Sequence, residues 1–253
     1  MPIRLSIPLH GRPPEHSFQH ITGLRAVVLG WLNAANPALA EELHKMEGPK
    51  PYTISPVWAR DGDRGFDICL LDHRLLTPLV TGFGASGPEI RLGNQWFQTG
   101  RPVVQQEQSW EEMPAPPPDN AHRLEIRLAT PTAHHAPGPF RKSIVLPSPE
   151  LYFGSWFGRW NRFSPWIMDE AVLDLVAERV VVSACEGRTC AVQMDPSRTF
   201  IGFQGVVLFQ ALKPKTLAPG ELAALWALAR LAPFCGTGVE TMRGMGQTEL
   251  LNG

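Results

Sequence analysis

Four glycines near the C-terminal end of the chain are spaced in a way that would let the backbone approach a phosphate group. They form two Gly-x-Gly pairs, Gly236/Gly238 and Gly244/Gly246, directly after an apolar stretch. Glycine permits positive φ and close backbone approach, so successive N–H groups can line up and cradle a phosphate. The segment is neither a dinucleotide-binding fingerprint nor a P-loop, because it follows a predicted helix, leads into a predicted strand and contains no Gly-Lys-Ser/Thr. A plain tight turn is the competing interpretation.

The eight histidines are the side chains most suited to general acid–base chemistry near neutral pH, since an unperturbed imidazole has a pKa of about 6.5. Residue type alone selects none of the eight. His134 and His135 stand side by side on a predicted loop without a neighbouring carboxylate, which makes a metal pair an unfavourable interpretation. The four cysteines lack Cys-x-x-Cys spacing and are typical of a protein with reduced thiols. We therefore expect no metal site and no cofactor.

The charge of the chain does not by itself indicate a nucleic-acid partner, because the formal net charge at pH 7 is -1. The distribution favours such a partner slightly: residues 121–253 carry 13 basic and 11 acidic side chains, against 10 and 13 in residues 1–120. Eighteen of the 23 basic residues are arginine, which suits bidentate phosphate contacts and stacking on bases. Only Glu150 offsets the basic residues of one stretch, which are Arg141, Lys142, Arg159 and Arg162. Ordinary solvated charge is the competing interpretation.

No part of the sequence indicates a membrane segment. Apolar runs such as those at 26–29 and 206–209 are far shorter than the roughly 18–20 residues of a membrane-spanning helix. The first residues alternate as Ile3-Arg4-Leu5-Ser6-Ile7, which predicts a strand and lacks the basic start and apolar stretch of a signal peptide. We expect a cytoplasmic protein.

A proline-rich segment at 113–119 divides the chain into halves with the same order of predicted elements, because its prolines exclude a helix or an interior strand. In the first half we expect strands at 2–9, 51–58, 65–71 and 89–99, and helices at 17–33, from Asn36-Pro37, and at 72–82. In the second half we expect strands at 123–129, 180–185 and 201–210 and a last short strand. The helices there run from Ser148-Pro149 to before Ser164-Pro165, at 168–179 and at 219–231.

Each half thus follows the β-α-β-β-α-β order of a ferredoxin-like unit. We predict an α+β protein with two tandem ferredoxin-like (RRM-like) domains, at 1–113 and 121–253, joined by a linker at 114–120. The second domain includes the glycine-rich segment. The fold alone does not decide the function.

Several stretches, in the expected order, resemble the CRISPR-associated endoribonucleases that process repeat RNA, which belong to the repeat-associated RNA-binding superfamily. Residues 234–246 resemble the family's C-terminal glycine-rich loop. Residues 36–55 resemble its short helix ending in Leu-His, a lysine a few residues on and a Phe/Tyr-Thr-x-Ser strand. Residues 153–161 and 202–206 resemble the first helix of the second domain and a later strand. The resemblance covers most of the chain and implies two ferredoxin-like domains that cleave within the repeat of precursor CRISPR RNA.

The resemblance also implies a metal-independent reaction, in which the neighbouring 2′-hydroxyl attacks the phosphate and leaves 2′,3′-cyclic phosphate and 5′-hydroxyl ends. Such a reaction needs a base, a cation for the charged phosphorane and an acid for the leaving oxygen. By its place in the Leu-His motif, His44 is expected to serve as base or acid. Lys50 matches the family's lysine and follows a Gly48-Pro49 turn that would aim it back toward His44, so we expect it to stabilise the phosphorane.

The chain departs from the family's pattern on the first helix, where several members carry a tyrosine that completes the site. The only tyrosines are Tyr52 and Tyr152. Arg25 or His20 on the first helix would be a substitute, although no matched motif supports either. The assignment of acid and base therefore stays open, and slow or single-turnover cleavage with the processed RNA retained fits the family.

We expect RNA to contact the backbone of the glycine segment and a set of basic side chains, namely Gly236, Gly238, Arg243, Gly244, Gly246, Arg141, Lys142, Arg159 and Arg162. Trp156 and Trp160 lie four residues apart on one helix face, where a core stripe is favoured over base stacking. The alternative function is that of a catalytically inactive subunit that holds repeat RNA in a CRISPR interference complex, with other subunits as partners. The resemblance implies a monomer or weak homodimer.

Overall fold

The computed structural model describes residues 1–11, 20–115, 122–136, 142–195 and 197–252. They group into two compact units. The first consists of residues 1–107, 193–199 and 242–244, and the second of residues 108–192, 200–241 and 245–253. Most of the predicted linker at 114–120 lies outside the described residues, so the predicted domain boundaries stay a prediction.

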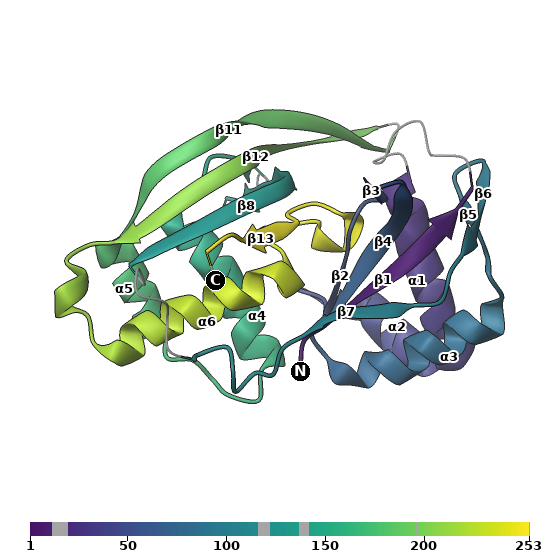
Figure 1. Ribbon diagram of the computed structural model, residues 1–253, viewed down its shortest axis with the longest axis horizontal. Helices are drawn as coiled ribbons and strands as arrows, with labels where there is room; N and C mark the ends of the chain where they lie inside the picture. Colours follow the sequence, from purple (N-terminus) through teal and green to yellow (C-terminus); the bar gives the residue numbers. More distant parts are fainter. Residues whose placement is uncertain (12–19, 116–121, 137–141, 196, 253) are drawn as a thin grey trace. The chain divides into compact units, whose positions relative to one another are not determined.

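The first unit is an antiparallel sheet with helices packed on one face (Figure 1). Its strands β1 (Ile3–His10) and β4 (Asp63–Leu70) pair along their length, and β7 (Val103–Glu107) lies on the other side of β1. The shorter strands β2 (Tyr52–Ile54) and β3 (Trp58–Arg60) both pair with β4, while the hairpin of β5 (Glu89–Leu92) and β6 (Gln95–Thr99) joins the end of β1. The helices are α1 (Ile21–Ala35), α2 (Pro37–Lys45) and α3 (Leu76–Ser86), the last preceded by the short 3-10 helix η2 (His73–Leu75).

The second unit repeats this plan with a four-stranded antiparallel sheet in the order β11-β12-β8-β13. These strands are β11 (Val180–Asp195), β12 (Arg198–Ala211), β8 (Arg123–Thr132) and β13 (Thr248–Leu250). The helices α4 (Pro149–Phe163), α5 (Ala171–Arg179) and α6 (Pro219–Cys235) accompany it, with the short elements β9 (His134–His135), β10 (Ser143–Ile144) and η3 (Pro214–Thr216). The short 3-10 helix η4 (Thr241–Arg243) divides between the units, with Thr241 in the second and its other two residues in the first. The fold is therefore α+β, with two ferredoxin-like units in tandem, as predicted.

Local sequence signals account for the helix starts. The Asn36 side chain accepts a hydrogen bond from the Leu39 amide at the start of α2, and that of Ser148 accepts one from the Leu151 amide at the start of α4. In both helices a proline occupies the first turn, where its missing N–H costs nothing. The ends were less well predicted: α6 continues to Cys235, past the predicted end at 231, with Pro233 in its last turn.

The sequence analysis does not predict β7, the strand that completes the ferredoxin-like order of the first unit. All five of its residues are exposed, so no buried face imposes the alternation by which a strand is recognised. The strands β11 and β12 are likewise longer than the predicted strands at 180–185 and 201–210. The prediction was too short because most of β11 is exposed and shows no alternation of apolar and polar residues.

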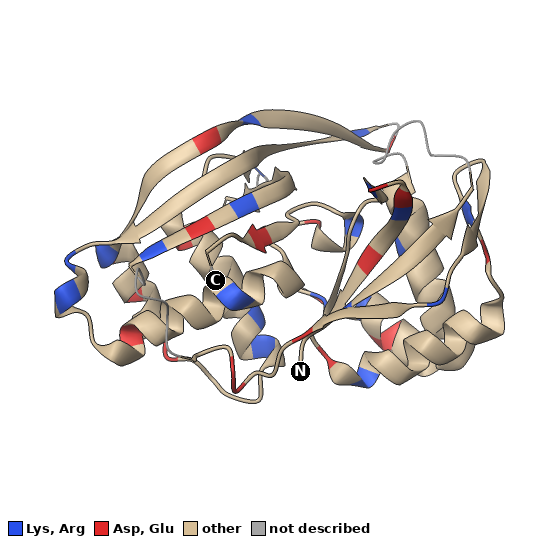
Figure 2. Cartoon of the chain, viewed as in Figure 1, with Lys and Arg blue, Asp and Glu red and all other residues tan. Residues whose placement is uncertain are grey.

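Basic and acidic residues are interspersed over both units, as along β8 (Figure 2). Among the described helices, none combines the length and the apolar character that crossing a membrane requires.

Candidate active site and glycine-rich loop

The end of α2 presents His44 to solvent. Leu43, one residue earlier, is 1% exposed and belongs to the hydrophobic core of the first unit, which anchors the last turn of the helix. His44 is exposed beside it. An imidazole in this place is accessible to a substrate and is held on a rigid element.

Lys50 folds back onto the end of α2. Its ammonium group donates hydrogen bonds to the carbonyl oxygens of Leu43 at 2.8 Å and His44 at 3.5 Å, and also to that of Met46. Gly48, with φ of 74°, makes the reversal between the helix and Lys50. The last carbonyls of a helix lack intrahelical donors and carry the negative end of the helix dipole, so a cation is stabilised there. A positive charge is thereby fixed beside the backbone of His44.

Arg25 on α1 is tied to the segment that follows Lys50. Burial raises the pKa of the Tyr52 hydroxyl, and the nearby charge and hydrogen bond of Arg25 act in the opposite direction. Tyr52 is 1% exposed and lies two residues after Lys50 at the start of β2. Arg25 is therefore linked to Tyr52, which follows Lys50 by two residues in the unit that also contains His44.

His20 lies elsewhere in the same unit. It is 7% exposed, and its ring makes an edge contact with Phe97 of β6 at 6.3 Å between centroids. Burial lowers its pKa, and the nearby backbone of Leu92 in β5 partly offsets this effect, although neither ring nitrogen has a partner at hydrogen-bond geometry. The strand order in the sheet is β2-β4-β1-β6-β5, so β2 and β5 are its opposite edges. His20 lies at the β5 edge and Tyr52 at the β2 edge, and the two residues are therefore far apart. Of the two substitutes for the missing tyrosine, only Arg25 is brought to the segment that contains His44 and Lys50.

The glycine-rich segment adopts a conformation that only glycine takes without strain. Gly236, Gly238, Gly244 and Gly246 have φ values of 66°, 78°, 77° and 64°. A Cβ on Gly238 would overlap the carbonyl oxygen of Ala133, and one on Gly246 would overlap that of Thr237. Close backbone approach is thus real, but its partner in this structure is the protein itself.

The amide groups of three of these glycines donate hydrogen bonds inside the protein, and their predicted contact with RNA stays a prediction. Gly236 donates to the carbonyl of Ala232, Gly246 donates to that of Pro131 at 3.0 Å, and Gly238 donates to the Ser155 hydroxyl at 3.0 Å. These N–H groups are not available to a phosphate while the loop keeps this conformation. The sequence pattern identified the backbone shape, and these partners of the N–H groups follow only from the structure.

Three side chains of helix α4 form hydrogen bonds with the glycine-rich segment. Besides the Ser155 hydroxyl, the Trp156 indole donates to the Thr237 hydroxyl at 2.9 Å, and the Arg159 guanidinium donates to the carbonyl of Gly238 at 2.7 Å. Arg159 also donates to the Ser155 carbonyl at 2.9 Å and is 6% exposed. Sequence reasoning missed Ser155 altogether, since a serine inside a helix carries no specific signal.

The other basic residues expected to contact RNA lie in different environments. Arg162 is exposed and stacks over the ring of Phe163 at 5.9 Å, and Lys142 is also exposed. Arg141 lies outside the described residues. Arg243 is half-buried in η4 and groups with the first unit. Arg159 differs from Arg162, because its guanidinium is buried and donates a hydrogen bond to the carbonyl of Gly238; its predicted contact with phosphate stays a prediction.

Two buried aromatic rings, those of His134 and Tyr152, lie in the same unit as helix α4. His134 and Tyr152 pack ring to ring at 5.2 Å between centroids. Burial lowers the pKa of His134 to about 4, with smaller contributions from the charges of Arg159 and His135. His134 is therefore neutral at physiological pH, and the exposed His135 points to the opposite side of the strand. The two rings of His134 and His135 thus diverge. Trp156 and Trp160 are also buried, at 0% and 4%, as expected for a core stripe.

We expect substitution of Arg159 and Arg162 to separate positioning from direct contact. Arg159→Met keeps the apolar stem but removes the donors to Gly238 and Ser155, which should lower the free energy of unfolding by about 1–3 kcal/mol. It should also weaken RNA binding, with partial rescue by Arg159→Lys. Arg162→Met should leave the melting temperature unchanged and reduce the salt dependence of binding by about one unit of slope. Equal melting temperatures for Arg159→Met and the native protein would contradict a stabilising role of the hydrogen bonds that Arg159 donates to Ser155 and Gly238.

The sequence and the fold of this chain are similar to those of known proteins. Residues 126–248 match the model of a family described as CRISPR-associated endoribonuclease Cas6. A solved Cas6 product complex is 25% identical with a TM-score of 0.86, covering 99% of this chain and 100% of that chain. The product complex of another Cas6 protein is 25% identical with a TM-score of 0.81 and 99% of each chain covered. A Thermus thermophilus Cas6 structure is 24% identical, with a TM-score of 0.76, over 99% of this chain and 98% of that chain. No curated protein sequence matches the chain.

Proposed function

We propose that the chain belongs to the Cas6 family of CRISPR-associated endoribonucleases, whose activity is RNA cleavage in the processing of CRISPR repeat transcripts; the match of residues 126–248 to the family model and the similarity to two Cas6 product complexes support this. From this premise we propose that the chain itself cuts repeat RNA without a metal ion. The neighbouring 2′-hydroxyl would be the nucleophile, and the products would carry 2′,3′-cyclic phosphate and 5′-hydroxyl ends. The observation that carries this proposal is an exposed histidine, His44, whose own carbonyl oxygen accepts a hydrogen bond from the Lys50 ammonium.

His44 supplies the proton chemistry of this reaction. As a general base, its neutral imidazole takes the proton of the 2′-hydroxyl while the new bond from that oxygen to phosphorus forms. As a general acid, its protonated imidazole gives a proton to the 5′-oxygen while the bond from phosphorus to that oxygen breaks. An imidazole can serve in either role. The contacts of His44 do not assign one of the two, and both remain within the proposal.

Lys50 and Arg25 supply positive charge for the phosphorane, which carries more negative charge than the starting phosphodiester. Fixed cations at the place where charge develops lower the barrier without reorganisation. Lys50 is fixed by the carbonyls of α2 and Arg25 by the hydroxyl of Tyr52. We assign Lys50 the larger share, because its ammonium donates a hydrogen bond to the carbonyl oxygen of His44.

The proposal is tested by incubating the purified chain with the repeat RNA of its own locus in excess EDTA. Substrates with a single 2′-deoxy substitution at each candidate position are tested in parallel. A single cut in EDTA that one deoxy substitution abolishes is the expected result. Cleavage that requires added metal, or that no deoxy substitution blocks, would overturn the mechanism.

We expect Lys50→Met to slow cleavage by about a hundredfold under single-turnover conditions, since one preorganised donor to a developing charge has an effect of about that size. The last turn of α2 loses its cap as well, so a small drop in melting temperature should accompany the change. Lys50→Arg keeps the charge and should recover part of the rate. A native rate for Lys50→Met would remove Lys50 from the site.

One observation favours a second candidate function, that of an inactive repeat-RNA-binding subunit of an interference complex. The first helix carries Arg25 where several members have tyrosine, and Arg25 is engaged with Tyr52. Tight binding of repeat RNA without any cut, in the experiment above, is the result that this alternative predicts. In both functions we propose that the chain keeps hold of the processed RNA and acts as a monomer or weak homodimer.

A further inference from the structure

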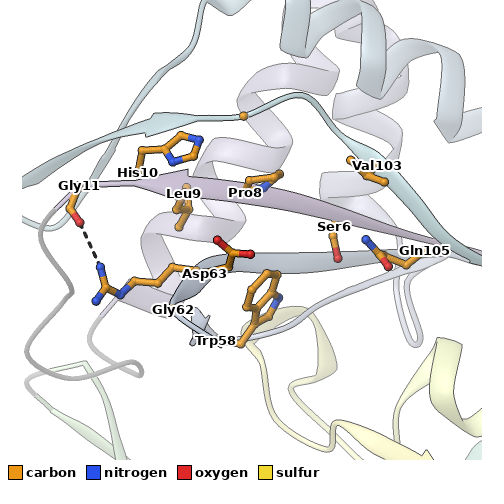
Figure 3. A pocket seen from close by; sticks show the side chains of 12 residues that line it. Ser6, Pro8, Leu9, His10, Gly11, Trp58, Gly62, Asp63, Val103 and Gln105 are labelled. Carbon is orange, nitrogen blue, oxygen red and sulfur yellow. Dashed lines mark hydrogen bonds between the residues drawn. The ribbon is translucent and has the colours of Figure 1, made fainter. Parts of the chain in front are cut away.

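The open face of the first sheet, away from its helices, carries a depression between β1 and its neighbours. Two adjoining cavities of about 550 and 400 Å³ share Ser6, Trp58, Asp63 and Gln105 in their linings. Figure 3 shows Ser6 and Pro8 of β1 between Trp58 and Asp63 on one side and Val103 and Gln105 on the other. Volumes of this size are typical of sites for small molecules or single nucleotides, roughly 300–1,000 Å³.

A buried carboxylate lies at this depression with one oxygen unused. Asp67 of β4 is 7% exposed and lines the smaller cavity. Its Oδ1 atom accepts two hydrogen bonds, from the Ser6 hydroxyl at 2.5 Å and from the Trp58 indole at 2.9 Å. Oδ2 accepts no hydrogen bond from the described residues. Oδ2 is not among the buried atoms that lack a partner, so it is accessible from the cavity and can accept from a ligand that brings N–H donors.

Planar side chains flank this acceptor. The Trp58 ring lies against Gly65, where any Cβ would meet its Cζ2 atom at 2.6 Å. The Arg60 guanidinium lies 5.2 Å from the centroid of the same ring. The Trp58 ring is thus held between Gly65 and Arg60, and the exposed Arg60 guanidinium is a plane of the kind on which proteins stack unpaired bases. Arg4 and Arg64 also line the cavities and can contact a phosphate. The linings contain Asp61 and Asp63 as well, so we expect the phosphate contact to be local and not the result of a basic surface.

We propose that this depression binds one unpaired guanine nucleotide of the RNA, with the base stacked on the Arg60 guanidinium and its N–H edge on Asp67. Guanine alone among the four bases presents two adjacent donors, N1–H and N2–H, on its pairing edge, whereas adenine, cytosine and uracil present a donor next to an acceptor. An oxygen that accepts from both donors therefore selects guanine; in Asp67 this oxygen is Oδ2, because Oδ1 already accepts from Ser6 and Trp58. The inference rests on the proposed function in that RNA is the ligand, but the residues belong to a different face from His44 and Lys50.

The test measures binding of short RNA to the full chain by fluorescence anisotropy. The probes are uridine hexamers with a single guanosine, inosine or adenosine at the third position. Inosine lacks the N2 amino group, so the native protein should bind the guanosine probe about tenfold more tightly than either other probe, the effect of one hydrogen bond to a charged acceptor. Asp67→Asn keeps an oxygen for Ser6 and Trp58 but places donors where Oδ2 was, and should abolish the preference.

Two further variants keep the result interpretable. Glu107→Gln on β7 changes an exposed carboxylate of the same sheet outside both cavities, and should keep the full preference. Asp63→Asn changes an exposed residue of the lining, so we expect folding to stay intact. The affinity for the three probes should change equally in this variant, and the preference for guanosine should stay. The melting temperature of each variant is recorded alongside.

Equal affinities for the three probes, or a guanosine preference that survives in folded Asp67→Asn, would overturn the inference. Cleavage of repeat RNA in EDTA is measured on the same native preparation and reports on the proposed function separately. A chain that cleaves repeat RNA but shows no guanosine preference fails only here. A chain with the preference and no cleavage keeps this site and loses the proposed activity.

Discussion

Replacing His44 with alanine is expected to reduce cleavage of repeat RNA by about 10²–10⁴-fold, the range that a positioned general acid or base contributes. The side chain is exposed and no described residue depends on it for packing, since the contact with Lys50 goes through the backbone carbonyl. Stability should therefore remain native. Repeat-RNA affinity should stay within about threefold, because phosphate contacts dominate such interfaces and one imidazole adds little. Single-turnover cleavage and equilibrium binding of the same RNA give the two numbers.

The matched control for this change is His73→Ala. His73 is another exposed histidine of the first unit, in η2, and is not part of the proposed site. This variant should cleave at the native rate. Loss of binding in parallel with cleavage in His44→Ala would mean that His44 holds the RNA and does not take part in proton transfer. Equal losses in both variants would point to a general effect of removing surface histidines.

The helices of this fold were more predictable than the strands, for a physical reason. Asn36-Pro37 and Ser148-Pro149 encode a helix start in two adjacent residues, through a side-chain acceptor and a fixed φ. A strand is encoded by the difference between its two faces, and β7 has no buried face from which that difference would arise. Its place in the sheet depends on pairing with β1, which is distant in sequence.

The same distinction applies to the site. The reversal at Gly48 that brings Lys50 back to the end of α2 is local, and the sequence predicted it. The contacts of Arg159 with Gly238, and of Asp67 with Ser6, join residues 79 and 61 positions apart. No local pattern reports such pairs, so a basic stretch was assigned to RNA although one of its members is buried. Position in the fold, and not residue type, separates Arg159 from Arg162.

Gly246→Ala should be the most damaging single substitution in the glycine-rich segment. The residue has φ of 64°, a region that costs any other residue about 1–2 kcal/mol. A Cβ there would also overlap the Thr237 carbonyl oxygen, while the Thr237 amide donates to the Gly246 carbonyl at 2.8 Å. Relieving the overlap breaks that bond, so we expect the free energy of unfolding to fall by about 3 kcal/mol in all. Chemical denaturation followed by tryptophan fluorescence measures the change.

The control for Gly246→Ala is the same chemical change at Gly158, which is exposed on α4 and has nothing within 4 Å of the position that a Cβ would take. Alanine favours a helix interior over glycine, so Gly158→Ala should raise the free energy of unfolding by about 0.5–1 kcal/mol. RNA affinity should fall in Gly246→Ala and stay native in Gly158→Ala. If Gly246→Ala instead kept native stability but lost RNA binding, the glycine would be needed for approach to the ligand, as the sequence pattern first indicated, and not for the fold of the segment. Native values of both quantities would mean that the loop relaxes around the methyl group at little cost.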